Sequence, residues 1–290
     1  MKDTQKQLQI YKSIDDFFLR SMSLKEDGSF ASFLKFLRNV PDHAPFNNML
    51  VFIQSPDCHY YASDSQWKKR FNRTIKHGAR PMVVLFPFGP VEFVYDISRT
   101  EGEPISDEKI LYWWRENGGT LDNKIVENTR CNLEKMEVDF KQVTIREYLD
   151  KVRSGTAGYA QRNLENDKMD IVLHPRYSVA DIESYGVLCH EVAHILLGHL
   201  GSKHINKVIK GVITSKEIAI DRAYLQKNVM ELEAELVAWI IFNSLGIEKN
   251  SEPYIASWMT AKNDINDIDM SLVLRVAGKI QEMGRKKSVF

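Results

Sequence analysis

The residue types best suited to chemistry stand together in His190-Glu191-Val192-Ala193-His194. On an α-helix, residues four apart lie on one face, so both imidazoles can reach one Zn²⁺ ion at about 2.0–2.1 Å. Glu191 lies about 100° around the helix, where its carboxylate can take a proton from water without binding the metal. The spacing therefore predicts a zinc-dependent hydrolytic site with two histidine ligands and Glu191 as the catalytic base. The plainer alternative is a helix with two surface or core histidines.

A third zinc ligand is expected from carboxylates clustered in a later helix, because catalytic zinc usually has three protein ligands. Glu231 and Glu235 are four residues apart and share a helix face, whereas Glu233 points roughly the opposite way. Ala234 and Ala238 lie on the side of that pair, so the two helices can approach closely. We assign Glu231 as the ligand and Glu235 as the acceptor that orients a ligand histidine, although these two roles can be exchanged. Without the histidine motif, the cluster would be interpreted as a solvated acidic face.

Other reactive side chains near the motif are expected to have structural roles. His199 is five residues after His194 and leaves the two-histidine face, which favours a cap or surface histidine. Tyr185 and Tyr224 have side chains that can stabilise an oxyanion, but their spacing does not support this, so we expect core tyrosines. Cys189 lacks a base arranged for nucleophilic chemistry and is expected to be a small buried residue.

A second candidate site is the basic aromatic segment 66–80, which carries six Lys or Arg residues and no acidic residue. Single-strand-binding proteins combine cations for the phosphates with aromatic rings on which bases stack. Taken alone, the segment favours a solvated basic helix face whose aromatic residues belong to the core, and contacts with single-stranded DNA are the alternative. The acid-free stretch 201–216 borders either a substrate cleft or a nucleic-acid path, or is a mobile loop. The predicted DNA-binding residues are Trp67, Lys68, Lys69, Arg70, Arg73, Lys76 and Arg80.

A framework of helices and short strands must position these residues. Hydrophobic periodicity predicts helices at 4–22, 28–39, 47–54, 64–72, 111–117, 144–150, 179–198, 217–245, 253–263 and 270–284. Short β-like runs occur at 59–62, 82–86, 91–96, 159–160 and 171–173. The predicted fold class is α+β, with a small α+β domain at 1–150 and a mostly helical domain at 151–290.

Composition limits the class of protein. The 290 residues carry 39 Lys plus Arg and 39 Asp plus Glu, so a protein that coats nucleic acid with its whole surface is excluded. No apolar run approaches the roughly 18 residues of a membrane span, and the first residues have no signal-peptide core. The three cysteines form no CxxC pair, as is typical of a reducing compartment. We expect a soluble cytoplasmic protein.

Two sets of stretches have a recognisable order along the chain. The N-terminal stretches are PFNNMLVFIQSP (45–56), SDSQWKKRF (63–71), IKHGARPMVVLFPF (75–88) and VYDISRTEGEPI (94–105). The C-terminal stretches are DIVLHP (170–175), the HEVAHILLGH run, ELEAELVAWIIFNSLGI (231–247) and PYIASWM (253–259). Together they resemble the ArdC-type antirestriction proteins of plasmids and related mobile elements. The resemblance implies a single-stranded-DNA-binding domain followed by a zincin-like (gluzincin) metallopeptidase domain related to the ImmA/IrrE proteases. In the ImmA/IrrE pattern a Glu stands at the place of Glu231 and often an Asn at that of Glu235, which favours Glu231 as the ligand.

The leading hypothesis is an intracellular metallopeptidase that binds single-stranded DNA and hydrolyses peptide bonds of a protein substrate with zinc as its cofactor. One alternative is a non-catalytic protein that protects single-stranded DNA and has a structural zinc domain. Another is a regulatory protease that cleaves a repressor-like protein and uses its basic segment to dock a protein substrate.

Overall fold

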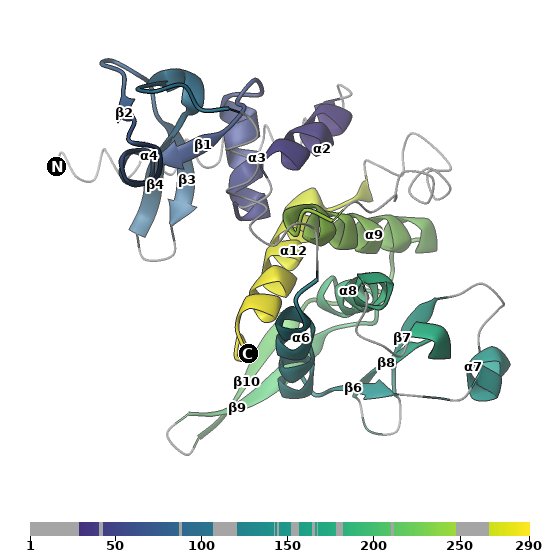
Figure 1. The fold of residues 1–290 in the computed structure, drawn as a ribbon. Helices are drawn as coiled ribbons and strands as arrows, with labels where there is room; N and C mark the ends of the chain where they lie inside the picture. The colour runs from purple at the N-terminus through teal and green to yellow at the C-terminus, as the bar shows by residue number, and fades with distance from the viewer. Residues whose placement is uncertain are drawn as a thin grey trace. The chain divides into compact units, whose positions relative to one another are not determined.

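The computed structural model shows an α+β protein, as predicted from the sequence (Figure 1). Contacts between residues divide the chain into two compact units, 1–116 and 117–290. No described helix is long and apolar enough to cross a membrane. The helices predicted at 4–22, 111–117 and 253–263 lie outside the described residues. The structure describes residues 29–40, 43–86, 89–106, 121–141, 143, 145–151, 157–163, 166, 168–177, 182–209, 212–247 and 267–290.

The first unit contains a three-stranded antiparallel sheet of order β1-β4-β3 and a two-stranded β2-β5 ribbon. Asn47 and Gln54, two helical turns apart in α3, use their amides to bond the backbone N–H and C=O of β3 at 2.8–3.0 Å. These amides therefore replace a neighbouring strand at this edge of the sheet. The elements are α2 (Ser29–Asn39), α3 (Pro45–Gln54), β1 (Tyr61–Ser63), α4 (Asp64–Phe71), β2 (Thr74–Ile75), β3 (Met82–Phe86), β4 (Gly89–Asp96) and β5 (Thr100–Glu101).

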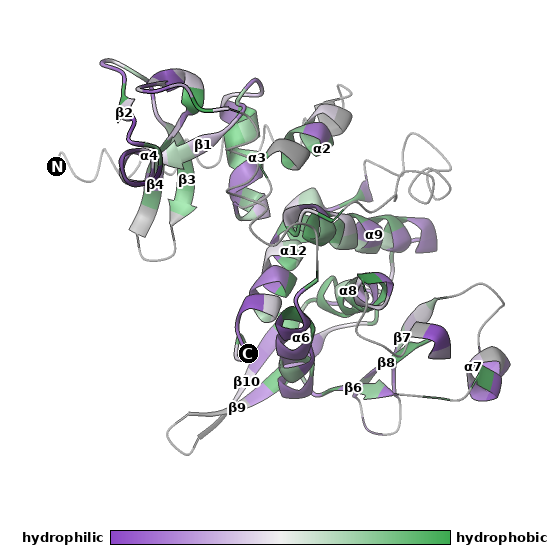
Figure 2. Cartoon of the chain, in the orientation of Figure 1, coloured by the Kyte–Doolittle hydropathy of each residue, from purple (hydrophilic) through white to green (hydrophobic). Residues whose placement is uncertain are grey.

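Helix α4 carries the first part of the basic aromatic segment, residues 66–71. The helix begins at a capping box on Ser63. Trp67 and Phe71, four residues apart, pack with Tyr60 and Ala62 in a buried cluster. The rest of the helix is mostly hydrophilic (Figure 2). Its aromatic side chains are therefore core residues, while its lysines and arginines face solvent.

The second unit is built around α8 and a small sheet of order β6-β8-β7, in which β6 is parallel and β7 antiparallel to β8. Helix α8 packs against β7, β8, α9 and α12, and every residue of β8 is buried. The elements are α6 (Asn123–Lys135), β6 (Val138–Lys141), α7 (Ile145–Lys151), β7 (Gly158–Arg162), β8 (Met169–Leu173), α8 (Ile182–Leu196), β9 (Lys203–Ile209), β10 (Val212–Ala219), α9 (Lys227–Ser244) and α12 (Met270–Arg285).

The two units meet in the chain at 116/117, earlier than the junction predicted at 150/151. Helix α6 packs against α12 in the second unit. Asn128 and Asn132 of α6 donate to backbone carbonyls at the C-terminal end of α12 at 2.7–3.1 Å. Strand β6 pairs with β8 along its whole length. Residues 123–141 therefore belong to the C-terminal unit, because their hydrogen-bonding partners lie there.

The segment after α8 is a β-hairpin, where the sequence suggested a loop followed by an early start of the next helix. Strands β9 and β10 pair in antiparallel register from Val212↔Ile209 to Ala219↔Lys203. Helix α9 begins at Lys227 rather than at residue 217. β-Branched residues stand on both sides of a Lys-Gly pair in this segment, which is a hairpin signal.

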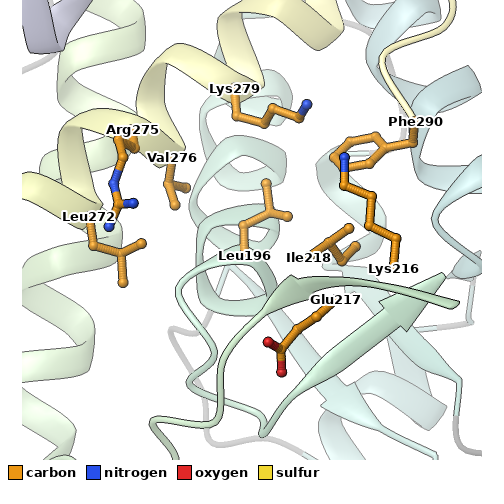
Figure 3. A pocket seen from close by; sticks show the side chains of 9 residues that line it. All are labelled: Leu196, Lys216, Glu217, Ile218, Leu272, Arg275, Val276, Lys279 and Phe290. Atoms are coloured by element: carbon orange, nitrogen blue, oxygen red, sulfur yellow. The ribbon is translucent and has the colours of Figure 1, made fainter.

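A cavity of about 240 Å³ lies in the second unit between α8, β10, α12 and Phe290 (Figure 3). The amino group of Lys279 lies 4.5 Å from the centre of the Phe290 ring at one side of this cavity. None of the predicted metal ligands lines it. The chemistry predicted from the histidine motif must therefore be sought on another face of α8.

Candidate metal centre

Helices α8 and α9 bring the predicted metal ligands together. His190 and His194 are one turn apart on α8, and Glu231 lies in the second turn of α9. The Phe242 ring of α9 packs against the backbone of Gly186 in α8, where an added Cβ would lie 3.1 Å from the ring. A residue as small as glycine at such a crossing lets the two helices pack close together.

The three side chains form a group that can hold a metal ion, with one ligating atom from each within 4.8 Å of the others. The Nε2 atoms of His190 and His194 are 3.2 Å apart, and a Glu231 carboxylate oxygen lies 3.4 and 3.8 Å from them. Two ligands at 2.0–2.1 Å from a tetrahedral zinc are about 3.3 Å apart. The donor set and its spacing therefore fit a zinc-sized ion with little rearrangement.

Glu191 is buried beside this group. Burial raises the pKa of its carboxyl group to about 7, and the nearby Glu231 carboxylate adds to this shift. The neighbouring His190 and a hydrogen bond with the backbone of Ala160 oppose it. Ala160 is in β7, so the carboxylate lies between the metal ligands and the sheet. A carboxylate in this place can exchange a proton with a molecule bound at the metal.

The two histidines have opposite electrostatic surroundings. Burial lowers the pKa of His190, but hydrogen bonds with Glu231 and Glu235 outweigh it and raise the pKa to about 9. Burial and the neighbouring His190 lower the pKa of His194 well below its ordinary value. The Glu235 carboxylate lies 3.3 Å from His190 Nδ1, the ring nitrogen that faces away from the metal group. This contact is the one expected of an orienting acceptor.

His199 is not the surface or cap residue that its spacing suggested. Its side chain is buried, and its Nδ1 lies 2.9 Å from His194 Nδ1. Gly198 adopts φ 77° and turns the chain back on α8, so a residue that would leave the histidine face on a continuous helix returns to it. A glycine directly before a histidine was the available sequence signal, because glycine at a helix end permits this reversal.

Glu233 lies next to His199 and is also fully buried. The sequence had placed it only on the helix side opposite to Glu231 and Glu235. Tyr185 and Cys189 are buried, as expected of core residues. Tyr224 is 79% exposed, so the expectation of a core tyrosine was wrong there. Tyr224 lies in the loop between β10 and α9.

Comparison with known proteins gives one structural match. The chain is similar to an antirestriction ArdC protein. The crystal structure of that protein, from the R388 plasmid and in a Mn(II)-bound form, matches with a TM-score of 0.37 and 13% sequence identity. The match covers 89% of this chain and 97% of that one. No family model matches the sequence, and no curated protein matches it.

The basic aromatic segment separates into buried and exposed residues. Trp67 is completely buried, and its Nε1 donates to Tyr95 O at 2.9 Å. Arg73 is buried as well and donates to the side chain and carbonyl of Thr100 at 2.7 and 3.0 Å. Neither side chain is accessible to a nucleic acid, so their prediction as direct DNA contacts is corrected. Their hydrogen bonds join α4 and the following turn to β4 and β5.

The remaining predicted DNA contacts lie at the surface of the first unit. Lys76 is exposed and donates to Ser98 O at 2.9 Å. The sequence overlooked Phe93 on β4, whose side chain is 54% exposed. An exposed aromatic residue on a strand cannot be distinguished from a core residue by periodicity alone. The other exposed cations are Lys68, Lys69, Arg70 and Arg80.

Proposed function

We propose that the protein is a zinc metallopeptidase of the gluzincin type, with His190, His194 and Glu231 as zinc ligands. The observation that carries the proposal is the convergence of these three side chains from two packed helices, with Glu191 buried beside them. Bound zinc would act as a Lewis acid toward water and the substrate carbonyl. Glu191 would accept the proton of the attacking water and deliver it to the leaving amine.

An extended peptide is the substrate that this arrangement favours. Among the described strands, β7 pairs on one side only, with β8. Ala160 lies in the middle of β7 and is hydrogen-bonded to Glu191. A peptide added along β7 would gain main-chain hydrogen bonds and place a carbonyl group near the base. Helix α8, which carries Glu191, packs directly on β7, as this proposal requires.

The test measures bound metal and cleavage of a peptide library by the wild-type chain and Glu191→Gln. We expect about one zinc per chain in both proteins, and a loss of cleavage of at least about 100-fold in the variant. Glu183→Gln is the matched control, because Glu183 is exposed on the same helix and near its start. A folded wild-type chain that binds no zinc, or a Glu191→Gln variant with full activity, would refute the proposal.

We further propose that the exposed cations of α4 and the following loop bind single-stranded DNA. Lys68 and Lys69 are consecutive on the solvent face of α4, and they have no ion pair with a described residue. Phosphate contacts of this kind make the affinity fall steeply with salt. Phe93 is an exposed aromatic ring among the described residues of this unit, and a base can stack on it.

Binding of a labelled oligonucleotide in increasing salt tests this proposal. We expect Lys68→Ala with Lys69→Ala to reduce the salt slope by about 1.4, at about 0.7 per contact, and Phe93→Ser to weaken binding at every salt concentration. Lys35→Ala is the control, an exposed lysine on α2 of the same unit. Equal losses in all variants would favour a surface that docks a protein instead.

In a cell, we propose a role of the antirestriction type, in which the protein protects entering single-stranded DNA or cleaves a regulator or nuclease. Glu191→Gln separates the two routes. Protection that persists in this variant would assign the effect to DNA occupancy, as in a non-catalytic binding protein. Protection that is lost while DNA affinity stays unchanged would assign it to peptide cleavage.

A further inference from the structure

The buried carboxylate of Glu233 is surrounded by hydrogen-bond donors. Arg222 donates to both of its oxygens, at 2.7 Å each. The backbone N–H of Asp269, just before α12, donates to one oxygen at 2.7 Å. His199 Nε2 lies 3.0 Å from the other oxygen. A buried carboxylate held by a guanidinium in this way is an acceptor at both oxygens.

The protonation of two histidines follows from this acceptor. Because Glu233 only accepts, the Nε2 of His199 must carry the proton that it donates. The Nδ1 of a neutral His199 then has a lone pair, so His194 Nδ1 must be the donor across the 2.9 Å contact between them. With its proton on Nδ1, a neutral His194 has a lone pair on Nε2, which faces His190 Nε2 and Glu231.

We infer that His199, Glu233 and Arg222 are positioning residues for the metal ligand His194. They hold His194 in the tautomer and the ring orientation in which Nε2 can bind a metal ion. Glu235 does the same for His190 through a direct contact, so the two ligands are oriented by two different devices. This inference rests on the proposed metal site and extends it to residues that bind neither metal nor substrate.

Arg222 also holds the turn that carries His199. Its backbone N–H donates to Gly198 O at 2.9 Å, and its guanidinium donates to Leu197 O at 3.3 Å. The same residue therefore contacts the end of α8 and the carboxylate of α9. Because Glu233 is also bonded to the start of α12, three helices meet at this network.

Three substitutions test the metal-binding consequence, with Zn²⁺ as the probe in competition with a chelator. His199→Leu removes the acceptor for His194 Nδ1, and we expect about 10- to 100-fold weaker zinc binding. His199→Asn is close to leucine in size but offers a carbonyl oxygen near the Nδ1 position, so it should restore most of the affinity. His204→Leu is the control, since His204 is half-exposed on the β9-β10 hairpin. Zinc binding by His199→Leu equal to wild type would overturn the inference.

Nitrogen NMR of the histidine side chains in the metal-free wild-type chain gives a second, independent result. We expect His194 to be protonated at Nδ1 and His199 at Nε2 near neutral pH. Glu233→Gln replaces one of the two acceptor oxygens with an N–H donor, which disturbs the acceptors that fix this order and should change the His199 tautomer. Observation of His194 as the Nε2–H form in the wild type would overturn the inference. Neither measurement uses a peptide substrate, so failure of the proposed peptidase activity leaves both results interpretable.

Discussion

Gly198→Ala is expected to destabilise the second unit far more than the same change three residues later. Gly198 has φ 77°, and Gly201 has φ 91°, so alanine at either position costs about 1–2 kcal/mol in backbone conformation. The surroundings differ. A Cβ at Gly198 would lie 1.7 Å from the backbone oxygen of Ile220, whereas a Cβ at Gly201 would lie 3.3 Å from the end of the Arg162 side chain.

The steric conflict at Gly198 sets the magnitude. Carbon and oxygen atoms that are not bonded come no closer than about 3.3 Å, so the two chain segments must separate. This separation breaks the hydrogen bond from Arg222 N to Gly198 O, which adds about 1–3 kcal/mol for the buried group left without a partner. We expect a total loss of about 2–5 kcal/mol for Gly198→Ala, against about 1–2 kcal/mol for Gly201→Ala.

Urea unfolding followed by hydrogen exchange in α8 and α9 measures both losses within the same unit. Zinc affinity should fall only in Gly198→Ala, because His199 moves with the turn and loses its contact with His194. Equal stability of the two variants, to within about 1 kcal/mol, would refute the steric argument. If a destabilised Gly198→Ala variant kept its zinc affinity, the turn at Gly198 would have no part in positioning the proposed metal ligands.

Three further predictions follow from buried groups and from the metal. Burial lowers the pKa of His43 to about 4 in the folded chain, whereas in the unfolded chain this histidine takes up a proton near pH 6.5. The folded chain therefore has its full stability above pH 6.5 and loses about 3 kcal/mol of it as the pH falls to about 4. Hydrogen exchange of β1 against pH should show this loss, and His43→Phe should flatten it; an equally steep profile in the variant would contradict the assignment. Trp67→Ala should cost about 3–5 kcal/mol in urea unfolding, whereas Lys68→Ala should cost less than about 0.5 kcal/mol; similar losses would mean that the indole is not a core group. Removing zinc with a chelator should lower the melting temperature of the second unit, since metal at 1,000 times its dissociation constant adds about 4 kcal/mol; an unchanged melting temperature would argue against a site in the folded chain.

Local patterns predicted most of the described helices, because each depends on contacts made every three or four residues, but α6 (Asn123–Lys135) was not predicted and α9 begins at Lys227 instead of 217. The observed α3, α4, α8 and α12 lie close to their predicted ranges. The β9-β10 hairpin and the early boundary at 116/117 were missed. Both depend on pairing between segments distant in the chain or on a turn between strands, and hydrophobic periodicity carries little information on either.

The basic aromatic segment shows why one pattern supports two interpretations. An amphipathic helix that binds DNA and one that packs on a core both alternate cations with aromatic rings. Periodicity places Trp67 and Phe71 on one face, but only the positions of Tyr60 and β4 show that this face is buried. The exposed lysines stay consistent with DNA binding, and the stacking ring has to be sought elsewhere in the unit.

The sequence by itself placed the two candidate metal-binding histidines on one face of α8, because residues four apart on a helix must share a face whatever surrounds them. It also placed Glu231 and Glu235 together for the same reason. Only the tertiary structure decided the roles of His199, Glu233 and Arg222, which come from a turn, a helix and a loop. Their contacts depend on the chain reversal at Gly198 and on how α8, α9 and α12 pack. Spacing along a single helix contains neither.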